Sequence, residues 1–295
     1  MNTIFGVPAP ALYGQVLIGL INGSFYAMLS LGLAVIFGLL CIINFAHGAQ
    51  YMLGAFVAYL ILNYGGVGYW PALVVAPLIV AGVAIVIERL MLRRLYGLDP
   101  LYGLLLTFGL ALIIEGLFRY WFGASGKPYA PPASLTGGMN LGFMFLPVYR
   151  GWVVVASLLV CLGTWLLIEK TRLGAYLRAA TENPVMVQAF GVNVPLLLTL
   201  AYGLGAGLAG LAGVLAAPIY QVSPLMGTNL IIVVFAVVVV GGMGSILGAI
   251  VTGYMLGLLE GLTKVFYPEA SSIVIFVIMA VVLLIRPAGL FGREV

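Results

Sequence analysis

Long apolar runs separated by short polar breaks fill this chain from end to end. Most runs are about as long as a helix that crosses a bilayer, and the charged residues stand mainly in the breaks. A segment inside a bilayer must satisfy its own backbone hydrogen bonds, so the pattern predicts an all-α fold, a polytopic membrane helical bundle. The predicted spans cover residues 13–40, 51–63, 71–87, 99–121, 151–168, 195–218, 229–240, 245–262 and 271–285.

Two of the polar breaks leave the number of spans open. The run from Asn44 to Gln50 and the glycines from Gly241 to Gly244 allow broken or re-entrant helices, so we expect about 8–10 transmembrane helices around a count of nine. The tetrapeptide Tyr51–Gly54 recurs as Tyr254–Gly257, which hints at an internal repeat of the kind found in transporters. Residues 122–150 are rich in proline and glycine and are predicted to form an external loop.

Composition places the whole chain in the membrane class. Hydrophobic residues make up 64% and charged residues 7% of 295 positions, and the mean hydropathy is +1.22. We therefore expect a single transmembrane domain over residues 1–295. The N-terminus lacks the basic region of a cleavable signal peptide, and Cys41 and Cys161 fall in apolar segments as buried hydrophobes would.

Basic residues predict the orientation. Three clusters follow an odd number of predicted spans, and they are Arg89/Arg93/Arg94, Lys170/Arg172/Arg178 and Arg286/Arg293. The positive-inside rule puts these clusters in the cytoplasm, with the N-terminus outside and the C-terminus cytoplasmic. The net charge of +4 therefore reports orientation, and nucleic-acid binding is the weaker interpretation.

One charged island interrupts the apolar pattern. Five of the 20 charged residues fall between Glu169 and Glu182, so this stretch must face water. Residues 173–181 can form one short helix, and Asn183 followed by Pro184 can cap and start a second that ends at Gly191. The second helix carries too much apolar surface for an isolated loop. That surface packs either on the protein's own spans or lipid headgroups, or on a partner subunit with a groove for a helix.

The island and several other motifs carry a family resemblance. The stretch from Thr171 to Asn193 resembles the cytoplasmic coupling loop of permeases in branched-chain amino acid ABC importers. Further segments look like signatures of that family in order: Asn22–Ser24, Ile43–Gly48, Gly241–Ser245, Glu260 and Arg286–Gly292. The resemblance covers nearly the full chain and is nearest to the LivH type, although Ala49 stands where relatives often carry an acidic residue.

The resemblance implies the function and the partners. It implies a permease subunit of the bacterial inner membrane that works by alternating access with a second, LivM-like permease, two LivG/LivF-like ATPases and a periplasmic substrate-binding protein. ATP and magnesium would sit on the ATPases, with no cofactor on this chain. The residues that the resemblance places against an ATPase are Arg172, Gly174, Arg178, Ala179, Glu182, Asn183 and Pro184.

Several alternatives remain open from sequence. The substrate could be a branched-chain amino acid, or urea or a short amide as in similar permeases, and an ion-coupled secondary transporter is the first rival. The chain has no Walker motif, so we expect a transport subunit without its own ATPase site and not an enzyme. A membrane-embedded enzyme is the second rival, and the lack of a clustered nucleophile, base and acid counts against it.

Polar residues inside the apolar runs are the candidates for a translocation pathway. They are Asn22, Ser24, Asn44, His47 and Gln50. The single histidine cannot form a metal site alone and is assigned a structural role near the break at Asn44. Glu115 with Arg119 and Glu260 with Lys264 are predicted to form ion pairs at helical spacing, and a proton relay is the minority interpretation. Gly203, Gly205, Gly207, Ala209 and Gly213 are predicted to permit close helix packing.

Overall fold

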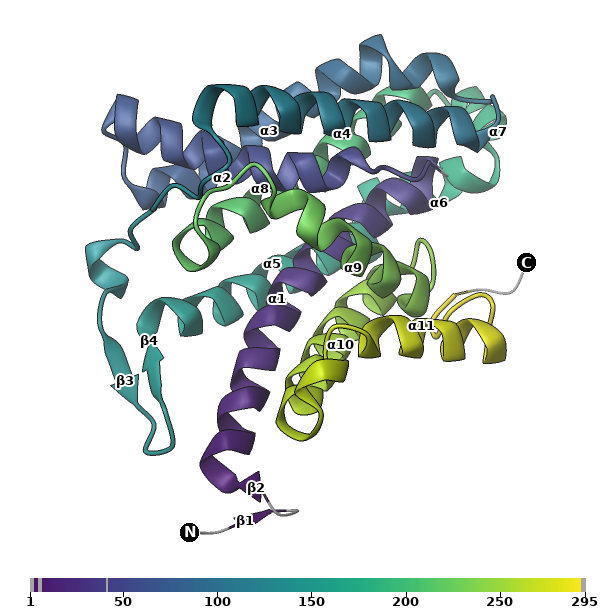
Figure 1. The fold of residues 1–295 in the computed structure, drawn as a ribbon. Helices are drawn as coiled ribbons and strands as arrows, with labels where there is room; N and C mark the ends of the chain where they lie inside the picture. Colours follow the sequence, from purple (N-terminus) through teal and green to yellow (C-terminus); the bar gives the residue numbers. More distant parts are fainter. Residues whose placement is uncertain (1–2, 5–6, 41, 293–295) are drawn as a thin grey trace. The chain divides into compact units, whose positions relative to one another are not determined.

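Helices form most of the structure, a computed structural model that describes residues 3–4, 7–40 and 42–292 (Figure 1). Two residues with a sequence prediction, Cys41 and Arg293, lie outside this range. The α-helices of the described residues are α1 (Ala9–Leu40), α2 (Ala46–Gly65), α3 (Tyr69–Leu90), α4 (Pro100–Phe122), α5 (Val148–Lys170), α6 (Arg172–Glu182), α7 (Pro184–Ala189), α8 (Val194–Tyr220), α9 (Met226–Gly241), α10 (Ile246–Phe266) and α11 (Val274–Ile285).

Short elements fill the connections. They are the strands β1 (Thr3–Ile4), β2 (Val7–Pro8), β3 (Gly138–Asn140) and β4 (Phe145–Pro147) and the 3-10 turns Leu92–Leu95, Ala133–Leu135 and Pro268–Ala270. Each pair of strands is antiparallel, β1 with β2 and β3 with β4. The proline and glycine residues of segment 122–150 predict a loop. Residues 138–147 of that loop nevertheless form a β-hairpin.

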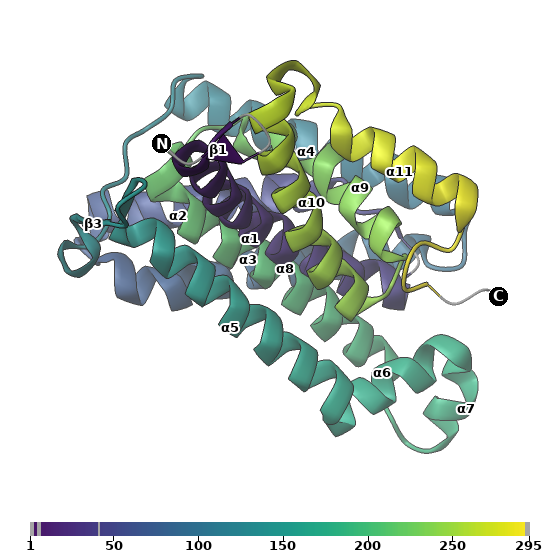
Figure 2. The ribbon, with the colours of Figure 1, turned by 90° about the horizontal axis from the view of Figure 1, so that it is seen from below.

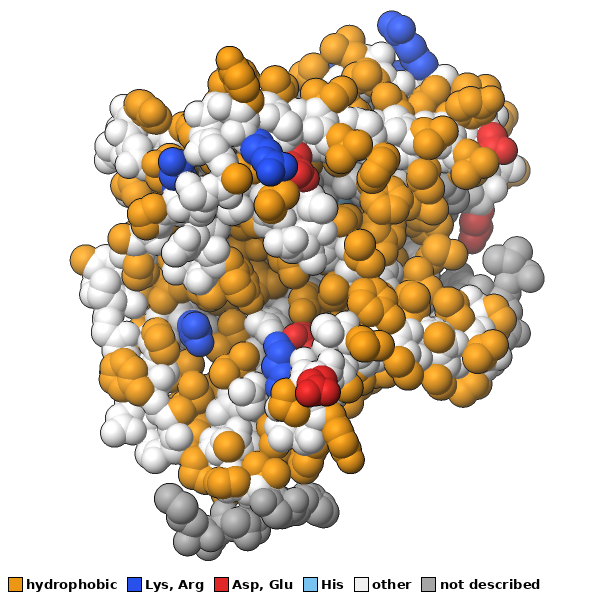
Figure 3. Space-filling view, viewed as in Figure 1, with side chains coloured by type: hydrophobic (Ala, Val, Ile, Leu, Met, Phe, Trp, Pro, Cys, Tyr) orange, Lys and Arg blue, Asp and Glu red, His pale blue; other side chains and the backbone are white. Residues whose placement is uncertain are grey.

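The predicted helical bundle is confirmed. Each of the nine predicted spans is a helix. Within the described residues, six helices are long and apolar enough to cross a membrane, namely α1, α3, α4, α5, α8 and α10. The helices α9 and α11 are shorter but apolar, and α2 has 20 residues. The chain is therefore a multi-pass membrane protein. Figure 3 shows the hydrophobic side chains that cover much of the surface over α3 and α4.

The start of the second span was predicted too late. The sequence prediction started the second span at Tyr51, whereas α2 begins at Ala46. The sequence prediction leaves the polar run before Tyr51 out of the span, because polar side chains in an apolar chain usually face water. Here the side chains of His47 and Gln50 are buried inside the protein, so the helix extends over them.

The contacts divide the chain into two compact units, which are described separately. Unit 1 contains Met1–Ser30, Pro131–Cys161 and Val233–Val295, and unit 2 contains Leu31–Ala130 and Leu162–Ile232. The helices α1, α5 and α9 contribute residues to both units. The single transmembrane domain over 1–295 stays a prediction.

In unit 1, the first part of α1 packs closely along α10, as Figures 1 and 2 both show. A Cβ atom at Gly19 would lie 2.6 Å from the Gly257 carbonyl oxygen, and one at Gly253 would lie 2.5 Å from Ala27 Cα. Only glycine permits two helical backbones to approach this closely. The van der Waals contacts between them stabilise helix association in a bilayer, where no hydrophobic effect drives helices together.

The C-terminal segment of unit 1 folds back on the α9–α10 turn. Gly242 and Gly244 have φ values of 99° and 84°, which favour glycine, and they form this turn. The Leu290 N–H donates to the Val240 carbonyl at 2.8 Å, and the Phe291 N–H donates to the Gly241 carbonyl. Two motifs far apart in the sequence are thus joined through their backbones.

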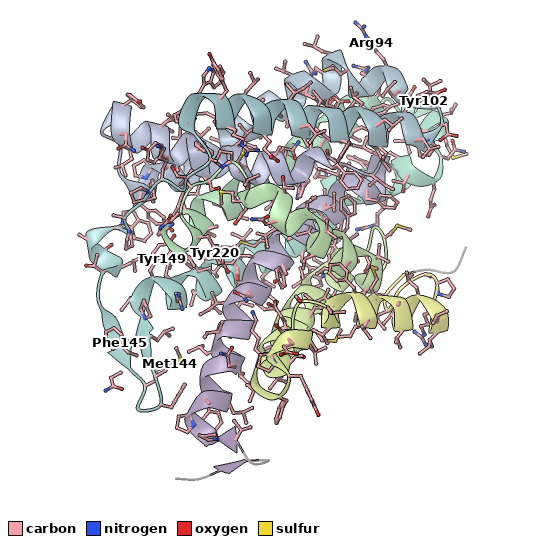
Figure 4. All side chains as sticks on the ribbon, in the orientation of Figure 1. Arg94, Tyr102, Met144, Phe145, Tyr149 and Tyr220 are labelled. Carbon is pink, nitrogen blue, oxygen red and sulfur yellow. The ribbon has the colours of Figure 1, made fainter. Side chains whose placement is uncertain are left out.

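The β3–β4 hairpin also belongs to unit 1, with Met144 and Phe145 at its end (Figure 4). The ring of Phe143 meets the ring of Tyr13 edge to face, with centroids 5.6 Å apart. The hairpin is therefore held on the start of α1.

In unit 2, α8 is the central helix, and α2 and α3 pack on it (Figure 1). The predicted small residues form this packing. A Cβ at Gly213 would lie 2.0 Å from the Tyr51 carbonyl oxygen, and one at Gly203 would meet Ile85 at 2.7 Å. The close approach predicted from the glycine spacing is confirmed.

Candidate functional site

The charged island forms two short helices, as predicted. The helix α6 covers Arg172–Glu182 and α7 covers Pro184–Ala189. The Asn183 side chain accepts a hydrogen bond from the Met186 N–H at 2.9 Å, which caps α7, and Pro184 occupies its first turn. Gly191, with a φ of 82°, turns the chain toward α8.

The second short helix has an inner and an outer face. Val187 is buried with Ala180 and Val194, so this side packs on the protein itself. On the other side, Val185 is 76% exposed and Phe190 is 81% exposed. Packing on the protein itself is therefore confirmed for the inner face of α7. The outer face has no cover among the described residues, and its contact with a partner stays a prediction.

Arg178 and Gly174 join α6 to the end of α5. The Arg178 guanidinium donates to the Ile168 carbonyl at 2.8 Å and pairs with the Glu169 carboxylate at 3.2 Å. Both side chains of the ion pair are about half exposed, so the pair contributes only about 0–1 kcal/mol. A Cβ at Gly174 would lie 1.6 Å from the Ile168 oxygen, so Gly174 is required for this junction.

The other predicted coupling residues lie on the surface of α6 and α7. Arg172, Ala179, Glu182, Asn183 and Pro184 are all exposed, whereas Gly174 is buried. Exposure makes these five side chains available to a partner, and that contact stays a prediction.

Three predicted pathway residues lie together in unit 2 near the start of α2. The Asn44 side chain is fully buried and lies near the Tyr202 hydroxyl. The Gln50 amide donates to the Tyr202 hydroxyl at 3.2 Å. The His47 ring faces the backbone of Gly32, where a Cβ would approach it to 3.0 Å.

Asn22 and Ser24 lie on the part of α1 that belongs to unit 1. The Ser24 hydroxyl donates to the Leu20 carbonyl one turn earlier, at 3.0 Å, and Ser24 is buried. The structure thus brings together Asn44, His47 and Gln50 and places the other two candidates in a separate unit.

Across the described ranges 3–4, 7–40 and 42–292, no three His, Cys, Asp or Glu side chains gather as they would around a metal ion.

The family comparison decides the class of this chain. The family described as "Branched-chain amino acid transport system / permease component" matches residues 15–283. The chain belongs to this family. No solved structure matches the permease.

Curated relatives cover nearly the whole permease. It is 31% identical to the high-affinity branched-chain amino acid transport system permease protein BraD of Pseudomonas aeruginosa, over 95% of each chain. It is 28% identical to LivH of Escherichia coli K12, again over 95% of each chain. A match to the permease protein LivM of the same organism has 28% identity and covers 90% of this chain and 67% of LivM.

Buried carboxylates of the permease have partners that the sequence did not reveal. Glu88 is fully buried in unit 2 and accepts hydrogen bonds from the Tyr96 and Thr199 hydroxyls, each at 2.8 Å. Burial and the hydrogen bond to Glu88 raise the pKa of Tyr96 above its ordinary value. Because Thr199 lies near the start of α8 and Glu88 near the end of α3, this hydrogen bond ties the start of α8 to α3.

The predicted ion pairs had different outcomes. Lys264 pairs with Glu260 at 2.6 Å, which confirms that prediction, and Tyr26 donates to the same carboxylate at 2.7 Å. The pair of Glu115 with Arg119 was wrong, because the Glu115 carboxylate accepts from the Thr228 hydroxyl of α9 instead. Helical spacing detects neighbours on one helix but not a donor from another.

Proposed function

We propose that this permease is one of two permease subunits in an ATP-driven importer for branched-chain amino acids. The names of BraD and LivH support this substrate class, and the similarity to LivM supports a pair of related permeases. Two ATPase subunits bind ATP and magnesium, and an external binding protein delivers the substrate. The permease alternates between outward and inward access as the ATPases close and open.

The outer face of α7 is the observation that carries this proposal. Val185, Met186 and Phe190 are exposed on a short helix whose opposite side is already packed in the protein. A helix that presents apolar anchors in this way fits a hydrophobic groove of a partner. Its firm attachment to α8 allows movement of the partner to reach the spans.

Charge favours a water-soluble partner over the lipid interior at this surface. The charged residues Glu169, Arg172, Arg178 and Glu182 are exposed at the end of α5 and on α6, the helix that precedes α7, and charged side chains are costly in hydrocarbon. A cytoplasmic ATPase offers both a groove for the apolar residues and polar groups at its rim.

Reconstitution of the complex tests the proposal. The permease is purified with its candidate partner subunits, placed in proteoliposomes and supplied with binding protein loaded with leucine, isoleucine, valine, urea or acetamide. We expect ATP hydrolysis and uptake to rise with the branched-chain amino acids. Transport by this chain alone, dependent on an ion gradient and indifferent to ATP, would instead establish a secondary transporter.

A matched pair of variants tests the docking surface. Phe190→Ser and Tyr64→Ser remove aromatic rings that are 81% and 82% exposed, and Phe190 follows α7 whereas Tyr64 lies in the last turn of α2. We expect Phe190→Ser alone to weaken association with the ATPases. We expect Glu182→Lys to uncouple hydrolysis from uptake while insertion stays normal. Equal ATPase association in both serine variants contradicts the docking role.

We further propose the bacterial inner membrane as the location, with the N-terminus outside and the C-terminus in the cytoplasm. The support is the cluster of basic residues after α3, including Arg94, which points away from the helices (Figure 4), and the clusters near α6 and after α11. A cysteine placed at Phe190 should react with a membrane-impermeant reagent only in inverted vesicles. Labelling of that cysteine in intact spheroplasts would reverse the orientation.

A further inference from the structure

A small cavity in unit 2 lies between α2, α4 and α9. Its volume is about 50 Å³. Since one water molecule needs about 10–15 Å³ on this scale, the cavity has room for about four waters. The walls are apolar apart from one carboxylate and one hydroxyl, and they include Phe45, Met52, Phe108, Leu112 and Ile231.

Glu115 stands in the wall of this cavity. Its carboxylate accepts from the Thr228 hydroxyl, which also lines the cavity, and Glu115 is only half buried. No cation pairs with Glu115 among the described residues, so its charge is not neutralised within the chain. A carboxylate within an apolar helix is costly in lipid and usually faces a water-filled passage.

The surroundings of Glu115 are polar on one side. Thr228 and Asn229 are exposed at the start of α9, and Arg119 is exposed one helical turn beyond Glu115 on the same face of α4. In the described part of the chain, Arg119 forms no ion pair. A carboxylate in the wall of an apolar cavity and a guanidinium one turn further along therefore share one face of α4.

We propose that this is a binding site for an aliphatic α-amino acid on its way through the permease. Glu115 binds the ammonium group, Arg119 binds the carboxylate, and the branched side chain enters the cavity. The inference rests on the proposed function, to which it adds the residues that recognise the substrate. In the proposed orientation, the site lies toward the outer end of α4, where a binding protein releases its ligand.

The size of the cavity and the spacing of the two charged side chains specify the class of ligand. An isobutyl or isopropyl group fits a volume of about four waters, whereas an aromatic ring does not. The two charged groups of an amino acid are attached to one carbon, which matches two side chains a single turn apart. The same charges occur in an ethanolamine phospholipid headgroup, so the test must separate these sources.

The first experiment compares two charge-removing variants in the full importer. Glu115→Gln keeps the size of the side chain and its bond to Thr228, and Glu269→Gln removes an exposed carboxylate after α10. We expect KM for leucine uptake to rise about 10- to 100-fold in Glu115→Gln alone, since a charged hydrogen bond is lost. We expect ATP hydrolysis at saturating leucine to stay near the wild-type rate.

A second variant tests the cavity. Ala111 lines it, so Ala111→Leu should fill it and shift the uptake preference from leucine toward alanine. The change in uptake preference tests the site even if the complex with Glu115→Gln does not assemble. Unchanged KM in Glu115→Gln, or unchanged preference in Ala111→Leu, refutes the site.

The outcomes separate the site from the proposed function. Wild-type complexes that show no ATP-dependent leucine uptake overturn the proposed function, and the site with it. Wild-type uptake with equal KM in Glu115→Gln and Glu269→Gln overturns the site alone. If the KM defect appears only in vesicles containing phosphatidylethanolamine, the group bound at Glu115 is a lipid headgroup, which also overturns the amino acid site.

Discussion

The replacement Gly54→Ala should force α2 and α8 apart. A Cβ at Gly54 would lie 2.0 Å from the Gly210 carbonyl oxygen and 2.5 Å from Gly210 Cα, whereas ordinary van der Waals contact begins at 3.4 Å. The atoms on the opposite side are backbone in a regular helix, so no side chain can rotate away. The two helices must therefore separate by more than about 1 Å, because the distance between the new Cβ and the Gly210 oxygen falls short of van der Waals contact by about that much.

Two opposing terms set the magnitude of this change. Alanine in a helix is more favourable than glycine by about 0.5–1 kcal/mol, and overpacking typically costs about 1–3 kcal/mol. The backbone contact puts Gly54→Ala at the upper end of that cost. We expect a net loss of about 2 kcal/mol in the free energy of unfolding.

Thermal unfolding in detergent measures this loss, and Gly82→Ala is the control. Gly82 lies on the exposed side of α3, where a Cβ would meet nothing within 4 Å, so alanine there should be neutral or stabilising. We expect the unfolding temperature to fall by several degrees for Gly54→Ala only. A rise in both variants would refute the close crossing of α2 and α8.

Three further predictions follow from local contacts. Glu260→Gln removes the charge that pairs with Lys264 and weakens the acceptor of Tyr26, so the free energy of unfolding should fall by about 1–3 kcal/mol, and a double-mutant cycle with Lys264→Met should show coupling. Asn183→Ala removes the cap of α7 and should destabilise that helix by about 1 kcal/mol, seen as faster hydrogen exchange over 184–189; unaltered exchange would contradict the role of the cap. Burial, followed by the neighbouring Tyr69, raises the pKa of Tyr129 to about 12. In the unfolded chain, Tyr129 ionises near pH 10. The stability that the buried, neutral Tyr129 contributes is therefore intact below pH 10 and is lost as the pH rises toward 12, so Tyr129→Phe should reduce the fall in the free energy of unfolding at alkaline pH.

Local signals predicted most of the helices. Asp99 caps α4 by accepting from the Leu101 N–H at 2.9 Å, and Asn183 caps α7, as their positions before proline indicated. Such caps act between residues two or three positions apart, so they can be recognised from the sequence. The start of α2 could not be recognised, because a polar residue buried in protein and one in water have the same local sequence.

The candidate site was predicted in part. Sequence identified Glu182 and Asn183 as surface residues of the charged island, and both are exposed. It did not identify Tyr202 near Gln50 or Tyr96 near Glu88, since an apolar run that contains a tyrosine gives no sign of its partner.

The sequence by itself determined the membrane class, the helical segments and the separation of the charged island from the apolar runs. These properties depend on segment length, on hydropathy and on caps within a few residues. Only the tertiary structure decided which face of α7 stays exposed, how closely the glycines of α2 and α8 approach, and which group binds Glu115. Its partner Thr228 is 113 positions away along the chain. Side-chain chemistry fixes what Glu115 can bind, but the packing of separate helices fixes which donor reaches it.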